Sequence, residues 1–180
     1  MIYLKQLKSV LIHKWYVFRA GKLTGVPLWR LVIHDWSKFT PTELFGYAGN
    51  AGGGVSKKKW ARAWLHHLHC NPHHPEHWVL SWLGNPDFYN GLGERIETFV
   101  TLMPMPETYV REMIADMMAT SKRVIGSYDI STWLNQNGPK MHLHDETIAL
   151  IDKVMKEIGY DTYNRDWSWI WPEITAETTI

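Results

Sequence analysis

The sequence lacks several features that stabilise or localise a protein. A single cysteine, Cys70, in 180 residues excludes an internal disulfide and favours a reducing compartment. The formal net charge of +1 gives no general reason to expect binding to duplex nucleic acid or to an anionic membrane. The first residues have neither the apolar run nor the cleavage site of a signal peptide. No segment approaches the roughly 18 consecutive apolar residues of a membrane helix, so we expect a cytoplasmic protein.

The composition is otherwise that of an ordinary globular protein. Hydrophobic residues make up 45% of the chain and charged residues 21%, so a core can form without disulfides. The length of 180 residues predicts a single domain over residues 1–180. We expect residues 127–180 to pack onto the rest of that domain.

Hydrophobic residues recur with helical spacing nearly throughout. A first helix is predicted to end near Gly21 and a second to cover residues 27–36. Thr40 and Glu43 have the spacing of a capping box, in which Thr40 caps the next helix and Glu43 reaches back. The stripe that marks the first helix consists of Leu4, Leu7, Leu11, Trp15 and Phe18.

Helices are also predicted over residues 57–70, 75–83, 92–103, 107–124 and 145–158. Asn71-Pro72 ends the first of these, because the residue before a proline avoids helical space. Gly126 and Gly159 end the last two. We find no convincing alternation of polar and apolar residues that would indicate a strand. The predicted fold class is therefore all-α, a compact helical bundle.

Tryptophan and histidine are abundant, with 11 and 10 residues. We interpret the tryptophans as packing and stacking residues. Six histidines lie between His66 and His77, and histidines scattered over a surface would not bunch in this way. The histidines are therefore the first place to look for a functional site.

His34 and Asp35 form the first candidate element. Adjacent residues on a helix point about 100° apart, so a pair in mid-helix rarely serves one ligand. This pair lies close to the helix break at Thr40-Pro41, where both side chains could turn toward one ion. An imidazole and a carboxylate suit Zn, Mn, Fe, Co or Ni. The alternative is a helix-end charge beside a packed histidine.

The histidine-rich run from 66 to 77 is the second element. It is predicted to form a helix end, a turn and a helix start, so that several imidazoles can converge. His67 is expected to point inward, and His73 and His74 lie in the turn. We expect two or three of the six to bind metal, against the alternative of a solvated turn. The sequence leaves open which of these bind: His66, His67, His69, His73 or His74.

Two further elements complete the set. Glu112 and Asp116 lie four residues apart, hence on one helical face, where they could form a salt bridge or provide metal carboxylates. His13 lies on the first helix, where a lone histidine is usually a packed side chain. Its place 21 residues before His34 gives it more weight.

The order of these elements resembles the HD-domain superfamily of metal-dependent phosphohydrolases. That superfamily has a histidine on an early helix, a His-Asp pair and a later aspartate, and its two-metal members insert further histidines. The segment IHDWSK at residues 33–38 is similar to its hydrophobic-His-Asp-x-Gly/Ser-Lys run. A closer resemblance, over roughly residues 13–120, is to an uncharacterised family of phage and bacterial proteins. It rests on HDWSKFTPTELFGYA, NPHHPEHW and MPETYVREMIADM.

The resemblance implies an HD-like fold and one or two divalent transition metals (Mn, Fe, Zn, Co or Ni) bridged by Asp35. It implies hydrolysis of a nucleotide or a related small phosphoester by a metal-activated water. Lys38 would neutralise a phosphate oxygen, although it could equally be a surface lysine, and Glu112 would orient a ligand histidine. The implied metal ligands are His13, His34, Asp35, His67, His73, His74 and Asp116.

Two alternatives remain from the sequence. Some relatives in the superfamily use a di-iron centre to oxygenate substrates. A metal-stabilised protein without catalysis, such as a phage factor that engages a host protein, would also suit the many tryptophans. A phage origin would place the chain in the host cytoplasm. The oligomeric state and the native metal are open.

The last part of the chain contributes fewer predictions. Asp129 and Trp133 are candidates for packing over the site. His142, His144 and Asp145 are expected at the cap of the last helix, where Asp145 favourably opposes the helix dipole, although His144 could reach a substrate.

Overall fold

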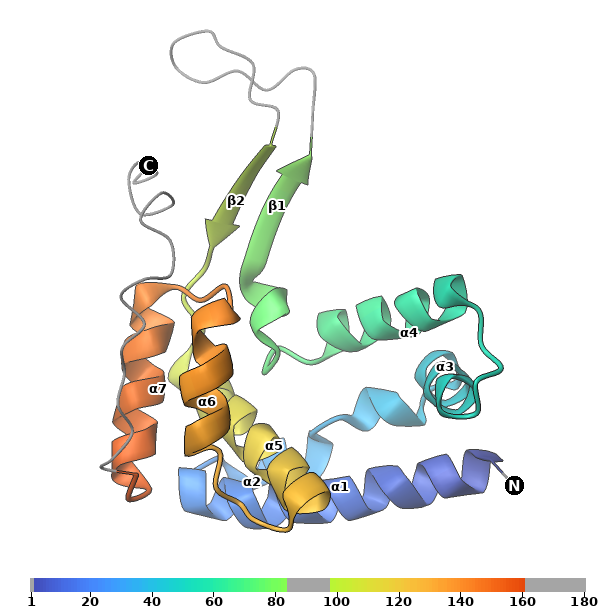
Figure 1. Ribbon diagram of the computed structural model, residues 1–180, viewed down its shortest axis with the longest axis horizontal. Helices are drawn as coiled ribbons and strands as arrows, with labels where there is room; N and C mark the ends of the chain where they lie inside the picture. The colour runs from blue at the N-terminus through green and yellow to red at the C-terminus, as the bar shows by residue number, and fades with distance from the viewer. Residues whose placement is uncertain (1, 84–97, 161–180) are drawn as a thin grey trace, which may run out of the picture.

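The computed structural model describes residues 2–83 and 98–160, and within them helices predominate (Figure 1). This confirms the all-α prediction, with one two-stranded sheet added. The elements are α1 (Ile2–Thr24), α2 (Leu28–Ile33), η1 (Trp36–Phe39), α3 (Pro41–Ala51), α4 (Lys57–Cys70), η2 (Pro75–Trp78), β1 (Val79–Leu83), β2 (Thr98–Leu102), α5 (Glu107–Ile125), α6 (Ser131–Asn137), η3 (Gly138–Lys140) and α7 (Asp145–Glu157).

The long helices α1 and α5 form the centre of the arrangement. α1 packs along α5 on one side and against α3 on another, α4 packs on α3, and α7 packs on α5. The β1–β2 hairpin projects away from these helices (Figure 1). None of the helices in the described part of the chain combines the length and apolar character that crossing a bilayer demands.

The core lies between α1, α5, α6 and α7. Burying each aliphatic side chain there contributes about 1.5–3 kcal/mol. Its fully buried members include Val17, Val110, Ile114, Leu134, Ile151 and Val154. Most of the apolar stripe that predicts α1 does not face this core, because Leu4, Leu11 and Trp15 are exposed, although Phe18 packs against it. The buried face of α1 carries Val10, His13 and Val17 instead, and this places His13 inside the protein.

Several predicted helices have the expected ends. α4 covers the predicted residues 57–70, and the Ser56 hydroxyl accepts a hydrogen bond from the backbone N–H of Lys59 as its N-cap. α5 ends at Gly126, whose φ of 79° is the left-handed conformation that glycine adopts at low cost. α7 begins at Asp145 as predicted.

The hairpin corrects two predictions. The predicted helix over residues 75–83 is wrong, because only Pro75–Trp78 is helical and Val79–Leu83 forms β1. The predicted helix over 92–103 is wrong at its end, where Thr98–Leu102 forms β2, and residues 92–97 lie outside the described residues. The strands pair antiparallel from Val79↔Leu102 to Leu83↔Thr98. β-Branched and aromatic residues suit this pairing.

The capping box at the start of α3 is also wrong. Thr40 is the N-cap and Pro41 the first residue, as predicted, but the Thr40 hydroxyl donates to the carbonyl of Ser37 at 2.7 Å. Glu43 does not reach back to it. Its carboxylate is fully buried and accepts from Nδ1 of two histidines of α4, because a buried carboxylate needs hydrogen-bond donors and the neighbouring helix supplies them.

Candidate metal centre

The backbone between α2 and η1 aims two adjacent side chains at one place. α2 ends at Ile33, and Asp35 has φ 54° and ψ 25°, the only positive φ outside glycine among the residues that the structure describes. Aspartate accepts this left-handed conformation more readily than most residues. His34 Nε2 and Asp35 Oδ2 consequently lie 3.4 Å apart, with both side chains fully buried. Lys14 of α1 supports the junction by donating to the carbonyls of Val32 and His34.

One group of ligand atoms lies on the α1 and α5 side of Asp35. His13 Nε2 is 2.8 Å from Asp116 Oδ1, and His34 Nε2 is 3.8 Å from the same oxygen. Asp35 Oδ2 faces this group, 3.7 Å from His13 Nε2. The three residues His13, His34 and Asp116 have the spacing of a set that could hold one metal ion.

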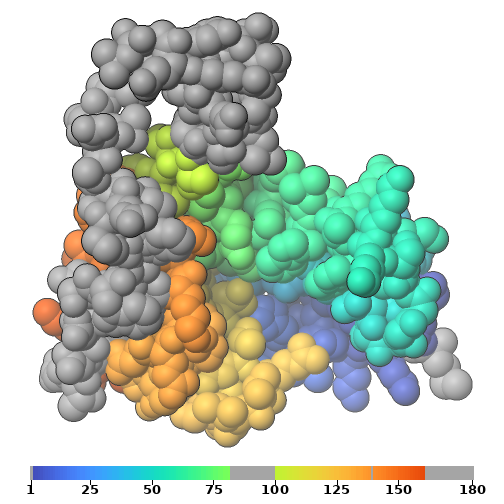
Figure 2. All heavy atoms as spheres, turned by 45° about the horizontal axis from the view of Figure 1, so that its top comes forward, coloured from blue at the N-terminus to red at the C-terminus, as the bar shows by residue number. Residues whose placement is uncertain are grey.

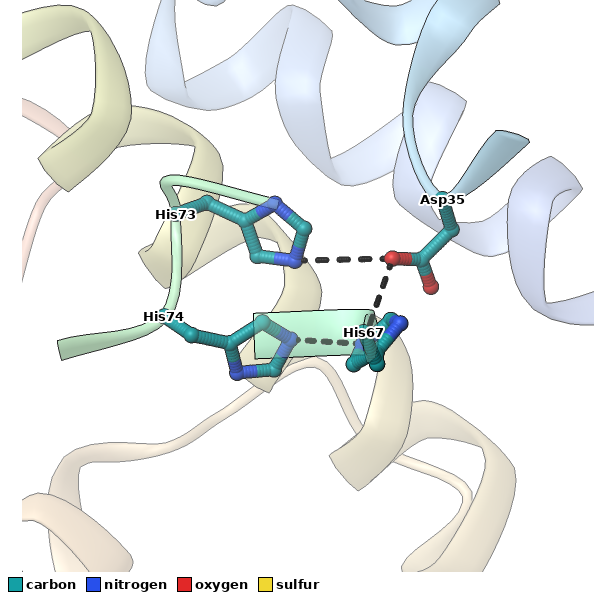
Figure 3. A group of neighbouring side chains, drawn as sticks. All are labelled: Asp35, His67, His73 and His74. Atoms are coloured by element: carbon teal, nitrogen blue, oxygen red, sulfur yellow. Dashed lines mark hydrogen bonds and ion pairs between the residues drawn. The ribbon is translucent and has the colours of Figure 1, made fainter. Parts of the chain in front are cut away.

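A second group lies on the other side of the same carboxylate (Figure 3). Asp35 Oδ1 is 3.6 Å from His67 Nε2 of α4 and 3.6 Å from His73 Nε2 in the following turn. His74 Nε2 lies 2.8 Å from His67 Nε2. These four residues also have ligand atoms close enough together for one ion. Asp35 thus directs one oxygen toward each group.

The distances fit metal ligation better than direct hydrogen bonding. Most atom pairs lie 3.4–3.8 Å apart, beyond the roughly 3.2 Å limit of a good hydrogen bond. Two ligands each about 2.1 Å from one tetrahedral ion are separated by about 3.4 Å. Six buried atoms here make no hydrogen bond within the described residues: His13 Nε2, His34 Nε2, Asp35 Oδ1, His73 Nδ1, His73 Nε2 and Asp116 Oδ1. Since each unsatisfied buried group costs about 1–3 kcal/mol, a cation would supply what they lack.

Buried carboxylates orient two of the ligand histidines. Glu112 accepts from His34 Nδ1 at 2.9 Å, and Glu43 accepts from His67 Nδ1 at 2.9 Å and from His66 Nδ1 at 2.7 Å. Because an ionised carboxylate only accepts, the proton belongs on Nδ1 of His67. Its Nε2, which lies 2.8 Å from His74 Nε2, then carries the lone pair that a cation would take. Carboxylate–histidine–metal arrangements of this kind are usual around metal sites.

Comparison with known proteins bears on the same residues. A family model described as "Family of unknown function (DUF5662)" matches residues 3–157. The chain belongs to this family. No curated protein and no solved structure matches it. The DUF5662 region contains all seven predicted ligands and ends with the last residue of α7.

Arg30 also belongs to the site, and the sequence did not predict it. Its Nε and one terminal nitrogen donate to Glu112 Oε2 at 2.9 and 2.5 Å, and its guanidinium lies over the ring of Tyr109. A third set, His34, His73 and Glu112, also has metal-like spacing, but Arg30 already neutralises this carboxylate and would repel a cation there. The available signal was an arginine in the otherwise apolar helix LWRLVI.

The charges of the centre favour ionised carboxylates. Burial alone would raise the pKa of Asp35, but His34 and Lys38 hold it well below its usual value. Burial alone would likewise raise the pKa of Asp116, and His13 lowers it strongly. Burial tends to lower the pKa of His34, yet Asp35 and Glu112 raise it to about 9. Burial instead lowers the pKa of His73 and of His74, so these two imidazoles stay neutral, as metal ligands must be.

Of the remaining predicted residues, one reaches the centre and three do not. Lys38 reaches the centre, with its Nζ 2.5 Å from Asp35 Oδ2. His66 contacts Glu43 and not the ligand groups, and His69 is exposed. His77 donates to the carbonyl of Leu68. Three of the six bunched histidines, His67, His73 and His74, therefore face the centre.

Among the candidates in the C-terminal part of the chain, only some lie near the centre. The Asp129 carboxylate accepts from the backbone N–H of Ser131 at the start of α6, and the lining of the cavity beside the centre does not include it. Trp133 does border it, in a cavity shared with His73, His74 and Asp116. His144 is the N-cap of α7 and accepts from the N–H of Glu146.

Proposed function

We propose that the protein is a metal-dependent phosphohydrolase that acts on a nucleotide or a related small phosphoester. The observation that carries the proposal is the position of Asp35 between two groups of ligand atoms. Its Oδ2 faces His13 and His34, and its Oδ1 faces His67 and His73. A carboxylate shared in this way is what a pair of neighbouring ions requires.

The donor set indicates which metals to test. It consists of imidazole nitrogens and carboxylate oxygens without a thiolate, which suits Mn, Fe, Zn, Co or Ni. A bound ion of this kind lowers the pKa of a coordinated water toward neutrality and so supplies a nucleophile. The chain's part is to hold the ligands still, and Glu43 and Glu112 do this from fully buried positions.

Lys38 provides a cation beside the bridging carboxylate. Burial tends to lower the pKa of Lys38, but Asp35, Asp116 and Glu43 raise it above its usual value, so the ammonium stays charged. A phosphate bound at the centre would lie within reach of this charge. The HD-like order of His13, His34-Asp35 and Asp116 supports phosphoester hydrolysis in particular, by analogy with that superfamily.

The test begins with elemental analysis of the purified protein. Phosphate release from nucleoside mono-, di- and triphosphates and cyclic nucleotides is then measured with each metal found. We expect Asp35→Asn to abolish release and His69→Ala, an exposed histidine of α4, to leave it unchanged. Equal release by wild type and Asp35→Asn would refute the proposal.

The same donors could also hold two irons, so the metal analysis separates the alternatives. Bound iron with substrate-dependent oxygen consumption would indicate an oxygenase. Unfolding on chelation, with no phosphoester hydrolysed, would indicate a structural metal in a binding protein. A redox-inert metal with phosphate release supports the hydrolase.

A further inference from the structure

A cavity of about 350 Å³ lies beside the metal centre. His73, His74 and Asp116 line it, so the cavity and the candidate ligands share a wall. Small-molecule sites usually measure about 300–1,000 Å³, so this cavity suits one small group and not a polymer. Figure 2 shows the surface recessed between the green segment after α4 and the orange segment that carries α6.

Much of the cavity's lining is apolar and polarisable. Met113 and Met117 come from α5, Trp133 from α6, and Met141 from the segment after η3. Trp133 is 47% exposed, so its indole has a face available to a ligand. Thioethers and indoles make favourable contacts with aromatic rings, and these exceed what their apolar area alone would give with a saturated ring.

The lining of the cavity therefore combines two kinds of chemistry. His73 and Asp116 belong to the centre, where a phosphate would react. The apolar lining offers the Trp133 indole with Met117 and Met141. Lys140 also lines the cavity, but its side chain is exposed and its Nζ lies 3.5 Å from Asn137 Oδ1. A ligand in the cavity would place its phosphate at His73 and Asp116 and its organic part against the apolar lining.

We propose that this cavity binds an aromatic ring carried by the alcohol part of the phosphoester, and that Trp133 is its specificity-determining residue. The assignment of the phosphate end rests on the proposed hydrolase function. The ring site itself rests on the cavity and its lining. An ester with a saturated ring of similar size would fit the volume but would lose the stacking contact.

The test uses a matched pair of substrates. Benzyl phosphate and cyclohexylmethyl phosphate are both esters of primary alcohols and differ in the aromaticity of the ring. With metal-loaded full-length protein, we expect kcat/KM to be about three- to tenfold higher for the benzyl ester, the size of an aromatic pair contact. Trp133→Ala should remove this preference and Trp133→Phe should keep most of it. Trp15→Ala, an exposed tryptophan on α1, is the control and should not change it.

A binding measurement separates the two proposals. Saturation-transfer NMR compares benzylphosphonate with cyclohexylmethylphosphonate, neither of which can be hydrolysed at the C–P bond by this chemistry. Stronger binding of the benzyl compound, lost in Trp133→Ala, supports the ring site even if no phosphoester is cleaved and the hydrolase proposal has failed. Equal behaviour of the two rings in both assays, or an unchanged preference in Trp133→Ala, overturns the ring site whether or not hydrolysis occurs.

Discussion

Removing the charge of Asp35 should abolish most of the stability that the protein gains from metal. Asparagine keeps the size of the side chain and also accepts the left-handed backbone conformation, so Asp35→Asn changes the carboxylate and leaves the junction intact. The carboxylate faces both sets of histidines, with Oδ2 3.7 Å from His13 Nε2 and Oδ1 3.6 Å from His67 Nε2. The effect of its loss should therefore appear in metal binding more than in the fold.

The size of the effect follows from mass action. An ion present at 100 times its dissociation constant stabilises the wild type by about 2.7 kcal/mol. For a chain of this length, that raises the Tm by about 5–11 °C. Changing a residue that merely orients a ligand costs about 10–100-fold in affinity, and a direct ligand should cost at least the upper value. At the same ion concentration, Asp35→Asn would then gain only about 0.4 kcal/mol, or about 1–2 °C.

The assay is thermal unfolding followed by circular dichroism. Protein freed of metal with a chelator is titrated with Zn²⁺, Mn²⁺ or Co²⁺, and the Tm is recorded at each concentration. Asp145→Asn is the matched control, because this aspartate is exposed in the first turn of α7. It should lose at most about 1 kcal/mol of basal stability from the helix dipole and keep the full metal-dependent rise.

Two results would refute this reasoning. If Asp35→Asn and Asp145→Asn show the same metal-dependent rise, Asp35 does not bind the ion. If no ion raises the Tm of the wild type, the unsatisfied atoms around Asp35 do not form a metal site, whatever their spacing.

Three further predictions concern residues around the centre and in the helix packing. Glu43→Gln should lower metal affinity about 10–100-fold, measured by competition with a chelating dye; unchanged affinity would contradict its orienting role. Arg30→Gln should destabilise the protein by about 3–5 kcal/mol in urea unfolding, since a buried carboxylate loses its partner. Gly46→Ala should cost about 1–3 kcal/mol, because the new Cβ would lie 2.4 Å from that of Ala63. Gly54→Ala, with open space around it, should change stability by less than about 0.5 kcal/mol.

The parts of the fold that the sequence predicts well have local signals at their ends. α4 has a serine cap at Ser56 and a stop at Asn71-Pro72, and α5 ends at Gly126. The hairpin has no comparable signal, because the pairing of β1 with β2 depends on contacts between segments separated in the chain. α6 was not predicted, since it is short and largely polar.

In the candidate site, too, some residues could be predicted from the sequence and others could not. The structure brings the seven predicted ligand residues together, and they could be named in advance because their order along the chain resembles that of the HD-domain superfamily. The partners that hold them do not follow such a pattern. Glu43 has the spacing of a helix cap, and only the packing of α3 on α4 brings it to His67. Arg30 meets Glu112 only after α2 has folded against α5.

With a single cysteine, the chain cannot cross-link its segments by an internal disulfide, but a bound metal could do so. The candidate ligands come from α1, the α2–η1 junction, the end of α4 with its turn, and α5. An ion held by all four segments would cross-link them, much as a disulfide does. In the chain-entropy view, each closed loop of moderate length restricts the unfolded ensemble by about 3–4 kcal/mol. The chain would thereby obtain a reversible cross-link without a disulfide, and chelation would break it.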